Sequence, residues 1–454
     1  MTFFLVLVGV TFASLTSMYI GQLPYFLFSS DKNLSEKKFG IVIDAGSSGS
    51  RLHIFSWDSL DMLASLSEIS RIKVKPGISS YATDESLRPQ DVGESMSSLI
   101  EHAKLVVPQS HHEKTRIYLK ATAGMRLLKS TERENILRSV RQYLGKTPFA
   151  FEPHFASVIS GKREAMYAWV SVNHATGGLM DASRTGNTDT LCGIIELGGA
   201  SSQIALHSRE IYEPRRGMSI LKPFGSRGKP ISLYAVSRLH FGLHEAYDKT
   251  LEYFVGTAWS SQKNEEGDRF PCGFAGDQTD SKYVQFEADY RACKDLVQKV
   301  VRLFENQDIG GVQDARGTLV PLQKKNPMSY FALDNFAKLL TILVEQELVF
   351  QNELLPGKKT YRITNLESIT HSIKRLCSKD WESVRLSFPK KVRDDHLLRK
   401  ACFGLIYMMH LIENLYYIKP STSFPLIFAH EINGTDASWA GGAIIHENMH
   451  AVTY

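Results

Sequence analysis

The sequence has little that points to nucleic acid, zinc or serine hydrolysis. Its 454 residues carry a formal net charge of only +5, and the basic residues are scattered rather than gathered in one block. This distribution gives no indication of a nucleic-acid partner. The five cysteines form no Cys-x-x-Cys pair or Cys/His cluster of the kind that holds zinc. No Gly-x-Ser-x-Gly motif occurs, which excludes a serine hydrolase that relies on that motif.

Charged side chains are also missing from the first thirty residues. The stretch from Phe3 to Phe28 is long and apolar enough to cross a bilayer as a helix. We expect residues 1–28 to be a signal anchor, or alternatively a signal peptide, and residues 29–38 to be a short polar stem. An anchored chain would hold its remaining residues in the lumen of a secretory compartment or outside the cell. A cleaved chain would be secreted.

The cysteines suit such a compartment. Cys272 lies close in sequence to Cys293, and Cys377 lies close to Cys402. Two local disulfides would therefore leave Cys192 unpaired, as a buried free thiol in an apolar strand.

Two glycine-rich segments have the same design. Each follows a β-type apolar run, places an acid at the end of that run, and then turns through glycine and hydroxyl residues. Backbone N–H groups can converge on a phosphate where side chains are small or absent, and the neighbouring acid can hold the accompanying cation. The acids are Asp44 and Glu196. The candidate phosphate-binding residues are Ser47, Ser48, Gly49 and Ser50 in the first segment, and Gly198, Gly199, Ala200, Ser201 and Ser202 in the second.

Strands alternate with helices along the chain, which predicts an α/β architecture. Hydrophobic spacing and turn residues give the following elements: strands at 40–43, 116–120 and 425–429; helices at 94–107, 133–144, 157–173, 234–254, 330–348, 366–376, 397–417 and from 438; loops at 174–190 and 430–436; and an irregular segment at 264–282.

Five segments, in order and in spacing, resemble the motifs of the apyrase family of nucleoside di- and triphosphate phosphohydrolases. They are residues 44–51, 120–128, 160–173, 195–203 and, more loosely, 438–443. The resemblance extends from Phe39 to Ile445.

The resemblance implies an actin-like, ribonuclease H-like fold with two α/β domains and a nucleotide cleft between them. Residues 39–168 and 436–454 would form the first domain, and residues 169–435 the second. Each domain would contribute one phosphate loop.

The resemblance also implies roles for single residues. Glu164 would be the general base, and Thr122 and Gln203 would position the attacking water or the terminal phosphate. Asp44 and Glu196 would hold Ca²⁺ or Mg²⁺ through waters. Tyr330 and Phe331 are the candidate base pocket.

One departure concerns the metal. The fourth family motif normally opens with aspartate, whereas Glu196 stands here, and the longer side chain predicts a shifted metal preference. Four pairable cysteines and no C-terminal span resemble the Golgi and secreted branch, which often favours nucleoside diphosphates. Two other functions remain open, an exopolyphosphatase of the same superfamily and a non-hydrolytic actin-like nucleotide-binding module. The oligomeric state stays open too.

Overall fold

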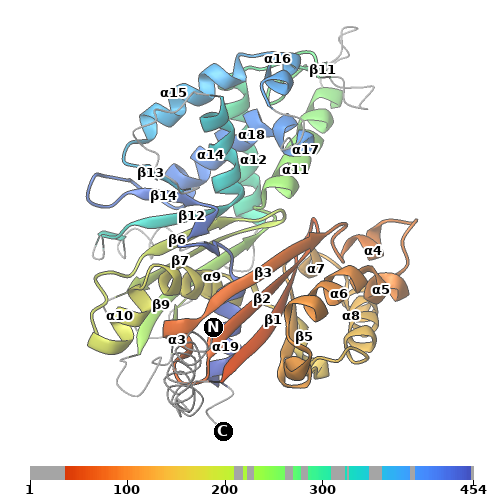
Figure 1. Ribbon diagram of the computed structural model, residues 1–454. Helices are drawn as coiled ribbons and strands as arrows, with labels where there is room; N and C mark the ends of the chain where they lie inside the picture. Colours follow the sequence, from red (N-terminus) through yellow and green to blue (C-terminus); the bar gives the residue numbers. More distant parts are fainter. Residues whose placement is uncertain are drawn as a thin grey trace, which may run out of the picture.

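Two α/β lobes make up the protein, and each is built around one twisted sheet (Figure 1). The computed structural model describes residues 36–208, 218–221, 230–260, 269–277, 285–307, 323–324, 327–346, 360–388 and 394–450. The predicted α/β fold class is confirmed. The predicted signal anchor or signal peptide lies outside the described residues, and none of the described helices is long and apolar enough to cross a bilayer.

The first lobe has a five-stranded sheet in the order β3-β2-β1-β4-β5. Its strands are β1 (Lys37–Ala45), β2 (Ser50–Asp58), β3 (Ser67–Val74), β4 (Arg116–Ala121) and β5 (Ala156–Val158). β1, β2 and β3 pair antiparallel, whereas β1, β4 and β5 pair parallel. The helices of this lobe are α3 (Met62–Ser65), α4 (Ser80–Thr83), α5 (Val92–Ser95), α6 (Ser97–Val106), α7 (Ala123–Arg126) and α8 (Ser130–Leu144).

The second lobe has a seven-stranded sheet in the order β13-β14-β12-β6-β7-β9-β8. Its strands are β6 (Gly193–Leu197), β7 (Ser201–Ser208), β8 (Met218–Leu221), β9 (Ile231–Leu239), β12 (Tyr330–Asp334), β13 (Thr360–Ile363) and β14 (Leu426–Ala429). The α-helices described between residues 178 and 410 are α10 (Gly178–Thr185), α11 (Leu243–Ser260), α12 (Tyr290–Gln307), α14 (Asn335–Glu345), α15 (Leu366–Cys377), α16 (Trp381–Leu386), α17 (Asp395–Arg399) and α18 (Ala401–His410). Two short strand pairs complete it, β10 (Arg269–Phe270) with β11 (Gln285–Phe286) and β15 (Glu431–Ile432) with β16 (Thr435–Asp436).

The two sheets repeat one topology. In each, three neighbouring strands pair antiparallel, β1-β2-β3 in the first sheet and β6-β7-β9 in the second. Two later strands extend each sheet in parallel from the first of these strands, β4 and then β5 in the first sheet, β12 and then β14 in the second. The second sheet has β8 and β13 as additional antiparallel edge strands. β6 thus corresponds to β1, β7 to β2 and β12 to β4. Registers match as well, because Asp44 pairs with Arg51 across the first hairpin and Glu196 with Gln203 across the second. The doubled motif of the sequence therefore belongs to a doubled fold.

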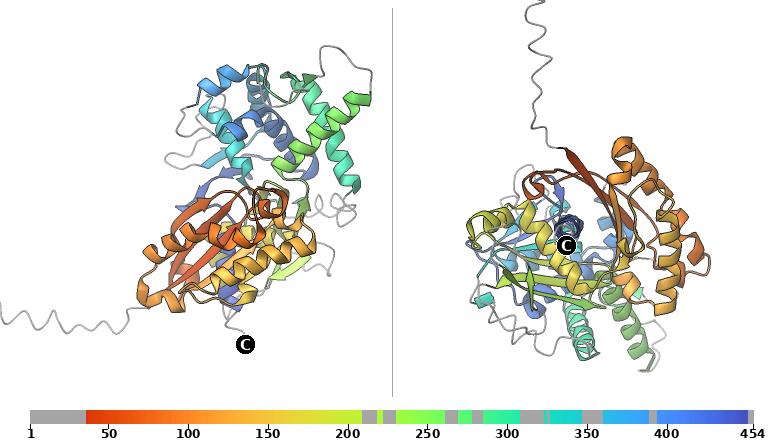
Figure 2. Two further views of the ribbon diagram at one scale, coloured as in Figure 1. Left: turned by 90° about the vertical axis from the view of Figure 1, so that its right-hand side faces the viewer. Right: turned by 90° about the horizontal axis from the view of Figure 1, so that it is seen from below.

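Two helices fill the space between the sheets (Figure 2). α9 (Gly161–Ala175) packs on strands of the second sheet, α19 (Ala440–His450) packs on β1 and β2, and the two helices contact each other. They approach closely because Gly442 has no side chain, since a Cβ there would lie 1.9 Å from the carbonyl oxygen of Tyr167. The helix α9, which carries Glu164, thus packs on the second lobe, while α19 packs on the first.

Three predicted segments differ from the structure. The predicted helix 234–254 is the end of strand β9 followed by α11, and the predicted helix 330–348 is strand β12 followed by α14. The predicted loop 174–190 contains the short helix α10. Strand 425–429 is confirmed as β14. The loop at 430–436 holds the β15–β16 hairpin, and the irregular segment 264–282 is described only at 269–277.

The cysteines pair as expected. Disulfides join Cys272 to Cys293 and Cys377 to Cys402, and Cys192 is free. Cys192 is partly buried and lies just before β6, so the expectation of a buried thiol within the strand is wrong.

Candidate active site

The two predicted phosphate loops are the tight turns of the β1–β2 and β6–β7 hairpins. In the first turn the Gly46 amide donates to Gly49 O at 3.0 Å, and in the second the Gly198 amide donates to Ser201 O at 2.9 Å. The turns face each other at close range, because a Cβ on Gly199 would lie 2.4 Å from Ser47 Oγ. Only glycine lets the hydroxyl of one lobe come this near the backbone of the other.

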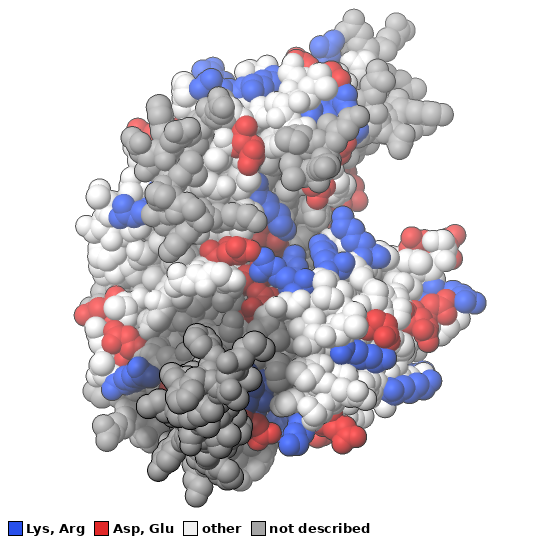
Figure 3. Space-filling model, in the orientation of Figure 1, with Lys and Arg blue, Asp and Glu red and all other residues white. Residues whose placement is uncertain are grey.

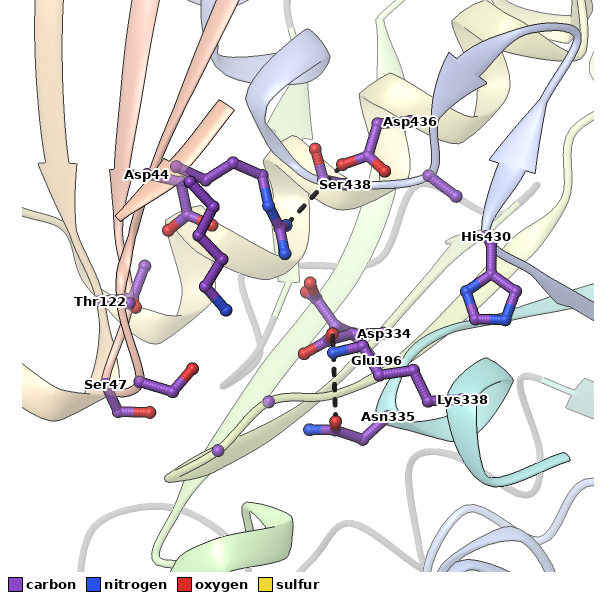
Figure 4. Close-up of a pocket in the computed structure, with 18 of the residues that line it drawn as sticks. Asp44, Ser47, Thr122, Glu196, Asp334, Asn335, Lys338, His430, Asp436 and Ser438 are labelled. Atoms are coloured by element: carbon purple, nitrogen blue, oxygen red, sulfur yellow. Dashed lines mark hydrogen bonds and ion pairs between the residues drawn. The ribbon is translucent and has the colours of Figure 1, made fainter. Parts of the chain in front are cut away.

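Both turns open into a cleft of about 870 Å³. Figure 4 shows Asp44, Ser47 and Thr122 entering it from the first lobe, opposite Glu196 and Asp334 of the second. Most of the predicted site residues line this cleft: Asp44, Ser47, Ser48, Gly49, Thr122, Glu164, Glu196, Gly198, Gly199, Ala200 and Ser201.

Glu164 lies in the first turn of α9. The helix begins at Gly161 because the Ser160 side chain accepts a hydrogen bond from the Arg163 amide at 3.2 Å. The carboxylate is 6% exposed, and burial raises its pKa against the opposing effect of Arg126. Among the described residues Arg126 is its donor, to Oε2 at 2.8 Å, which leaves Oε1 for a water.

Arg126 connects Glu164 to the second turn. Besides Glu164, the same Nη2 donates to Ser201 Oγ at 3.0 Å, and Nη1 donates to the carbonyl of Ile159 at 3.2 Å. One guanidinium therefore fixes the carboxylate of α9 relative to a serine that lines the cleft from the other lobe.

Asp44 and Glu196 occupy corresponding places, each next to last in its strand. Burial raises the pKa of both carboxyls, and for Glu196 the nearby carboxylates of Glu164, Asp334 and Asp44 raise it further, well above its usual value. Glu196 Oε2 is buried with no hydrogen-bond partner among the described residues. A buried carboxylate oxygen of this kind is costly unless a ligand satisfies it.

Gln203 is placed behind the cleft wall rather than in it. Its Nε2 donates to Ser201 Oγ at 2.6 Å and to Ser237 Oγ at 3.0 Å, and its side chain is buried. Gln203 therefore orients Ser201, which does line the cleft.

Four other predicted residues are buried elsewhere. Ser50 starts β2, and Ser202 lies in β7, where its hydroxyl donates to the Glu196 carbonyl at 2.8 Å and accepts from Tyr416 at 2.7 Å. Tyr330 and Phe331 lie in β12, 5% and 6% exposed, in the two hydrophobic clusters that cover the second sheet. The structure does not bring either aromatic side chain to the cleft.

Asp334 is a cleft residue that the sequence analysis missed. It ends β12, beside Glu196 on the neighbouring strand, with φ at 54°, a backbone conformation that is strained for a residue other than glycine. Burial pushes its pKa up, but the ammonium of Lys338, 2.5 Å from Oδ1, more than offsets this and lowers the pKa. In the sequence, Asp334 is an acid directly after an apolar run, as Asp44 and Glu196 are at the ends of theirs. It was not singled out because this segment was predicted to be part of the helix 330–348.

A row of cations on one face of β3 was also missed. Arg71, Lys73 and Lys75 alternate along the strand and just past its end, and all three line the cleft. Alternating basic residues in a strand are the signal that would have found them.

Comparison with known proteins identifies the family. Residues 30–453 match the model of the GDA1/CD39 (nucleoside phosphatase) family. Probable apyrase 6 of Arabidopsis thaliana is 28% identical over 93% of this chain and 74% of its own length, and the Golgi apyrase of Saccharomyces cerevisiae is 27% identical over 83% of this chain and 63% of its own.

A solved structure shows the same fold. The crystal structure of nucleoside triphosphate hydrolases from Neospora caninum superimposes with a TM-score of 0.69 at 13% identity, covering 97% of both chains. The predicted actin-like two-lobe fold is confirmed. The chain is a nucleoside phosphate hydrolase and belongs to the GDA1/CD39 (nucleoside phosphatase) family.

Proposed function

We propose that the protein hydrolyses the terminal phosphate of nucleoside diphosphates, nucleoside triphosphates or both, with a water activated by Glu164. The observation that carries this proposal is the convergence of both hairpin turns and the Glu164 carboxylate on one cleft. The two turns can bind a phosphate chain from opposite sides, and Glu164 lies at the buried end of that chain.

Glu164 has the environment of a general base. Burial raises its pKa above the usual value of a carboxyl, which increases its affinity for the proton of an attacking water. Its Oε1 would take the proton of a water that attacks the terminal phosphorus. The bond from that phosphorus to the bridging oxygen breaks, which releases inorganic phosphate and the shortened nucleotide.

The remaining residues hold the phosphates and the water. Backbone amides of the two turns, with the hydroxyls of Ser47 and Ser201, would donate to phosphate oxygens. Thr122, which precedes α7 and lines the cleft, would position the water or the terminal phosphate. Gln203 would act through Ser201, whose hydroxyl it holds.

A divalent cation suits the carboxylates opposite each other. Asp44 and Glu196 offer the oxygen ligands that Ca²⁺ and Mg²⁺ prefer, and such a cation or its waters would satisfy Oε2 of Glu196, which has no hydrogen-bond partner among the described residues. Among the described residues no three acidic, histidine or cysteine side chains converge to hold a metal directly, and the proposed contacts run through waters. The bound cation would neutralise charge on the phosphate oxygens.

We further propose that the catalytic lobes lie in the Golgi or another secretory compartment, or outside the cell, anchored by residues 1–28 or secreted after their removal. The uncharged N-terminal stretch, the two disulfides and the similarity to a Golgi apyrase support this location.

The test is phosphate release by residues 39–454 from a panel of nucleoside di- and triphosphates and inorganic polyphosphate, with Ca²⁺, Mg²⁺ or a chelator. Glu164→Gln should lower kcat by about 10² to 10⁴-fold, because it removes the base and keeps the shape. Glu132→Gln, a surface change in α8, is the matched control. A Glu164→Gln protein as fast as the parent would show that another group is the base.

A further inference from the structure

The cations along β3 are not accounted for by the loops or by the base. Arg71, Lys73 and Lys75 are two residues apart, so they point to the same side of the strand, and that side faces the cleft. Figure 3 shows Lys and Arg side chains gathered along the hollow between the lobes.

Two of these cations form no ion pair within the described part of the chain. Arg71 pairs with Asp436 at 3.5 Å and with Glu431, Arg51 pairs with Asp436 at 3.8 Å, and Lys338 pairs with Asp334. Within the described part of the chain, no carboxylate lies within ion-pair distance of Lys73 or Lys75. The ammonium groups of these two lysines are therefore available to pair with an anionic ligand in the cleft.

Both lysines pass directly over the first phosphate loop. A Cβ on Gly49 would lie 2.7 Å from Lys73 Cε and 3.5 Å from Lys75 Cγ. The turn after β3 is pressed onto the same loop, because a Cβ on Gly77 would lie 2.4 Å from Ser47 O. Phosphate held by residues 46–49 would therefore lie within reach of these ammonium groups.

The field at Lys73 favours an anion. The ammonium end of Lys73 is partly buried, which lowers its pKa, and the cations Arg51 and Lys338 lower it further against the opposing effect of Asp334. A bound phosphate would relieve this repulsion and stabilise the charged form.

Depth in the cleft separates the lysines from the chemistry. Glu164 is 6% exposed, whereas Lys73 and Lys75 are open to solvent. The phosphate that is cleaved must approach Glu164, so the lysines meet phosphates farther from the breaking bond. With its terminal phosphate at Glu164, a diphosphate extends less far toward the lysines than a triphosphate does.

We propose that Lys73 and Lys75 bind the outer part of the phosphate chain and make the site select for three linked phosphates over two. This inference rests on the proposed function and differs from the diphosphate preference that the resemblance implies. The shared ligand chemistry is a linear triphosphate, whether it carries a nucleoside or not.

The experiment compares the parent with Lys73→Gln/Lys75→Gln. It measures kcat/KM for ATP, ADP, inorganic tripolyphosphate and pyrophosphate at fixed ionic strength. Loss of charge-assisted hydrogen bonds should lower kcat/KM for ATP about tenfold or more, with less than about threefold change for ADP. An equal loss for the tripolyphosphate shows that the chain itself is recognised, and a loss confined to ATP shows that the nucleoside is required as well.

Lys146→Gln is the control, because this lysine is exposed after α8 and does not line the cleft. Calorimetric binding of ATP and ADP in the Glu164→Gln background gives a readout without turnover, and it also applies if the parent releases no phosphate and the proposed function fails. Equal losses of affinity or of kcat/KM for ATP and ADP, or an unchanged affinity for ATP, would show that these lysines do not select for the triphosphate.

Discussion

At the scale of single residues, the site depends on carboxylates that differ in their surroundings. Asp44 and Glu196 correspond to each other in the repeated topology, yet one side chain is longer by a methylene. Glu164 differs from both because Arg126 pairs with it at 2.8 Å. These differences give predictions for the cation and for the base.

Glu196→Asp should change the ratio of Ca²⁺-supported to Mg²⁺-supported kcat, on the order of tenfold, because the shorter carboxylate rearranges the waters around the cation. Steady-state rates at saturating concentrations of each ion measure this ratio. Asp181→Glu, a length change in exposed α10 outside the cleft, is the control. Unchanged ion selectivity would remove Glu196 from the cation site.

Arg126→Gln should shift the acidic limb of the kcat/KM profile to higher pH. The Arg126 cation lowers the pKa of Glu164 against the effect of burial, so its removal lets that pKa rise and the base protonates at a higher pH. Arg126→Lys keeps the charge and should shift the limb less. A limb that stays in place would mean that a different group controls it.

Whether a site residue could be predicted from the sequence depends on whether its role follows from its neighbours in the chain. The turn residues and Glu164 could be predicted because a glycine turn and the start of a helix both depend on residues that are adjacent in the sequence. Asp334 and Lys73 depend instead on strands that meet only in the folded chain. The same holds for Ser50 and Ser202, whose neighbours in sequence line the cleft while they face the core.

At the scale of elements, the contact between α9 and α19 positions α9, which carries Glu164, relative to the first lobe. Gly442→Ala should destabilise the protein by about 3 kcal/mol, since the new Cβ would lie 1.9 Å from backbone that cannot move aside. Gly256→Ala in α11 has open space and should stabilise by up to about 1 kcal/mol. Urea unfolding measures both. Similar effects at the two positions would contradict the packing account.

A buried ion pair fastens α19 to the strand that leads to Thr122. Lys120 of β4 lies 3.0 Å from Glu447, which also accepts from the Tyr167 hydroxyl of α9 at 3.2 Å. Burial pushes the pKa of Glu447 up, but Lys120 and the hydrogen bonds more than offset this and lower it below 4.5.

Glu447→Gln should therefore cost stability near neutral pH and less in acid. A carboxyl whose pKa is depressed on folding stabilises the protein above its unfolded pKa of 4.5, and this contribution is lost as the pH falls through the folded pKa. Unfolding free energies at pH 7 and near pH 3 compare parent and variant. A difference that stays constant or grows in acid would contradict the ion pair.

Element boundaries were predictable where one face of a helix is polar. The predicted helices 94–107 and 133–144 correspond to α6 and α8 in this way. The predicted helix 157–173 corresponds to α9, although most residues of that helix are buried. The predictions fail at 234–254 and 330–348, where a buried strand is followed within a few residues by a helix. The strands β9 and β12 are apolar and buried on most sides, so hydrophobic spacing cannot separate their period of two from a helical period of 3.6.

At the scale of the whole molecule, the two similar glycine-rich segments predicted two related lobes. The repeated strand order of the two sheets explains why the segment occurs twice. The pairing of distant strands such as β12 with β6 was not predictable from local pattern, because it joins segments far apart in the chain. The domain boundaries at 168 and 436 stay a prediction, although all strands of the smaller sheet fall within residues 37–158.

The central claim is that two opposed turns hold one phosphate chain with its terminal phosphate at Glu164. A crystal structure with a non-cleavable nucleoside triphosphate analogue and Ca²⁺ tests it most directly. We expect the phosphates between residues 46–49 and 198–201, and the terminal one next to Glu164 Oε1. Phosphates bound anywhere else would contradict the account.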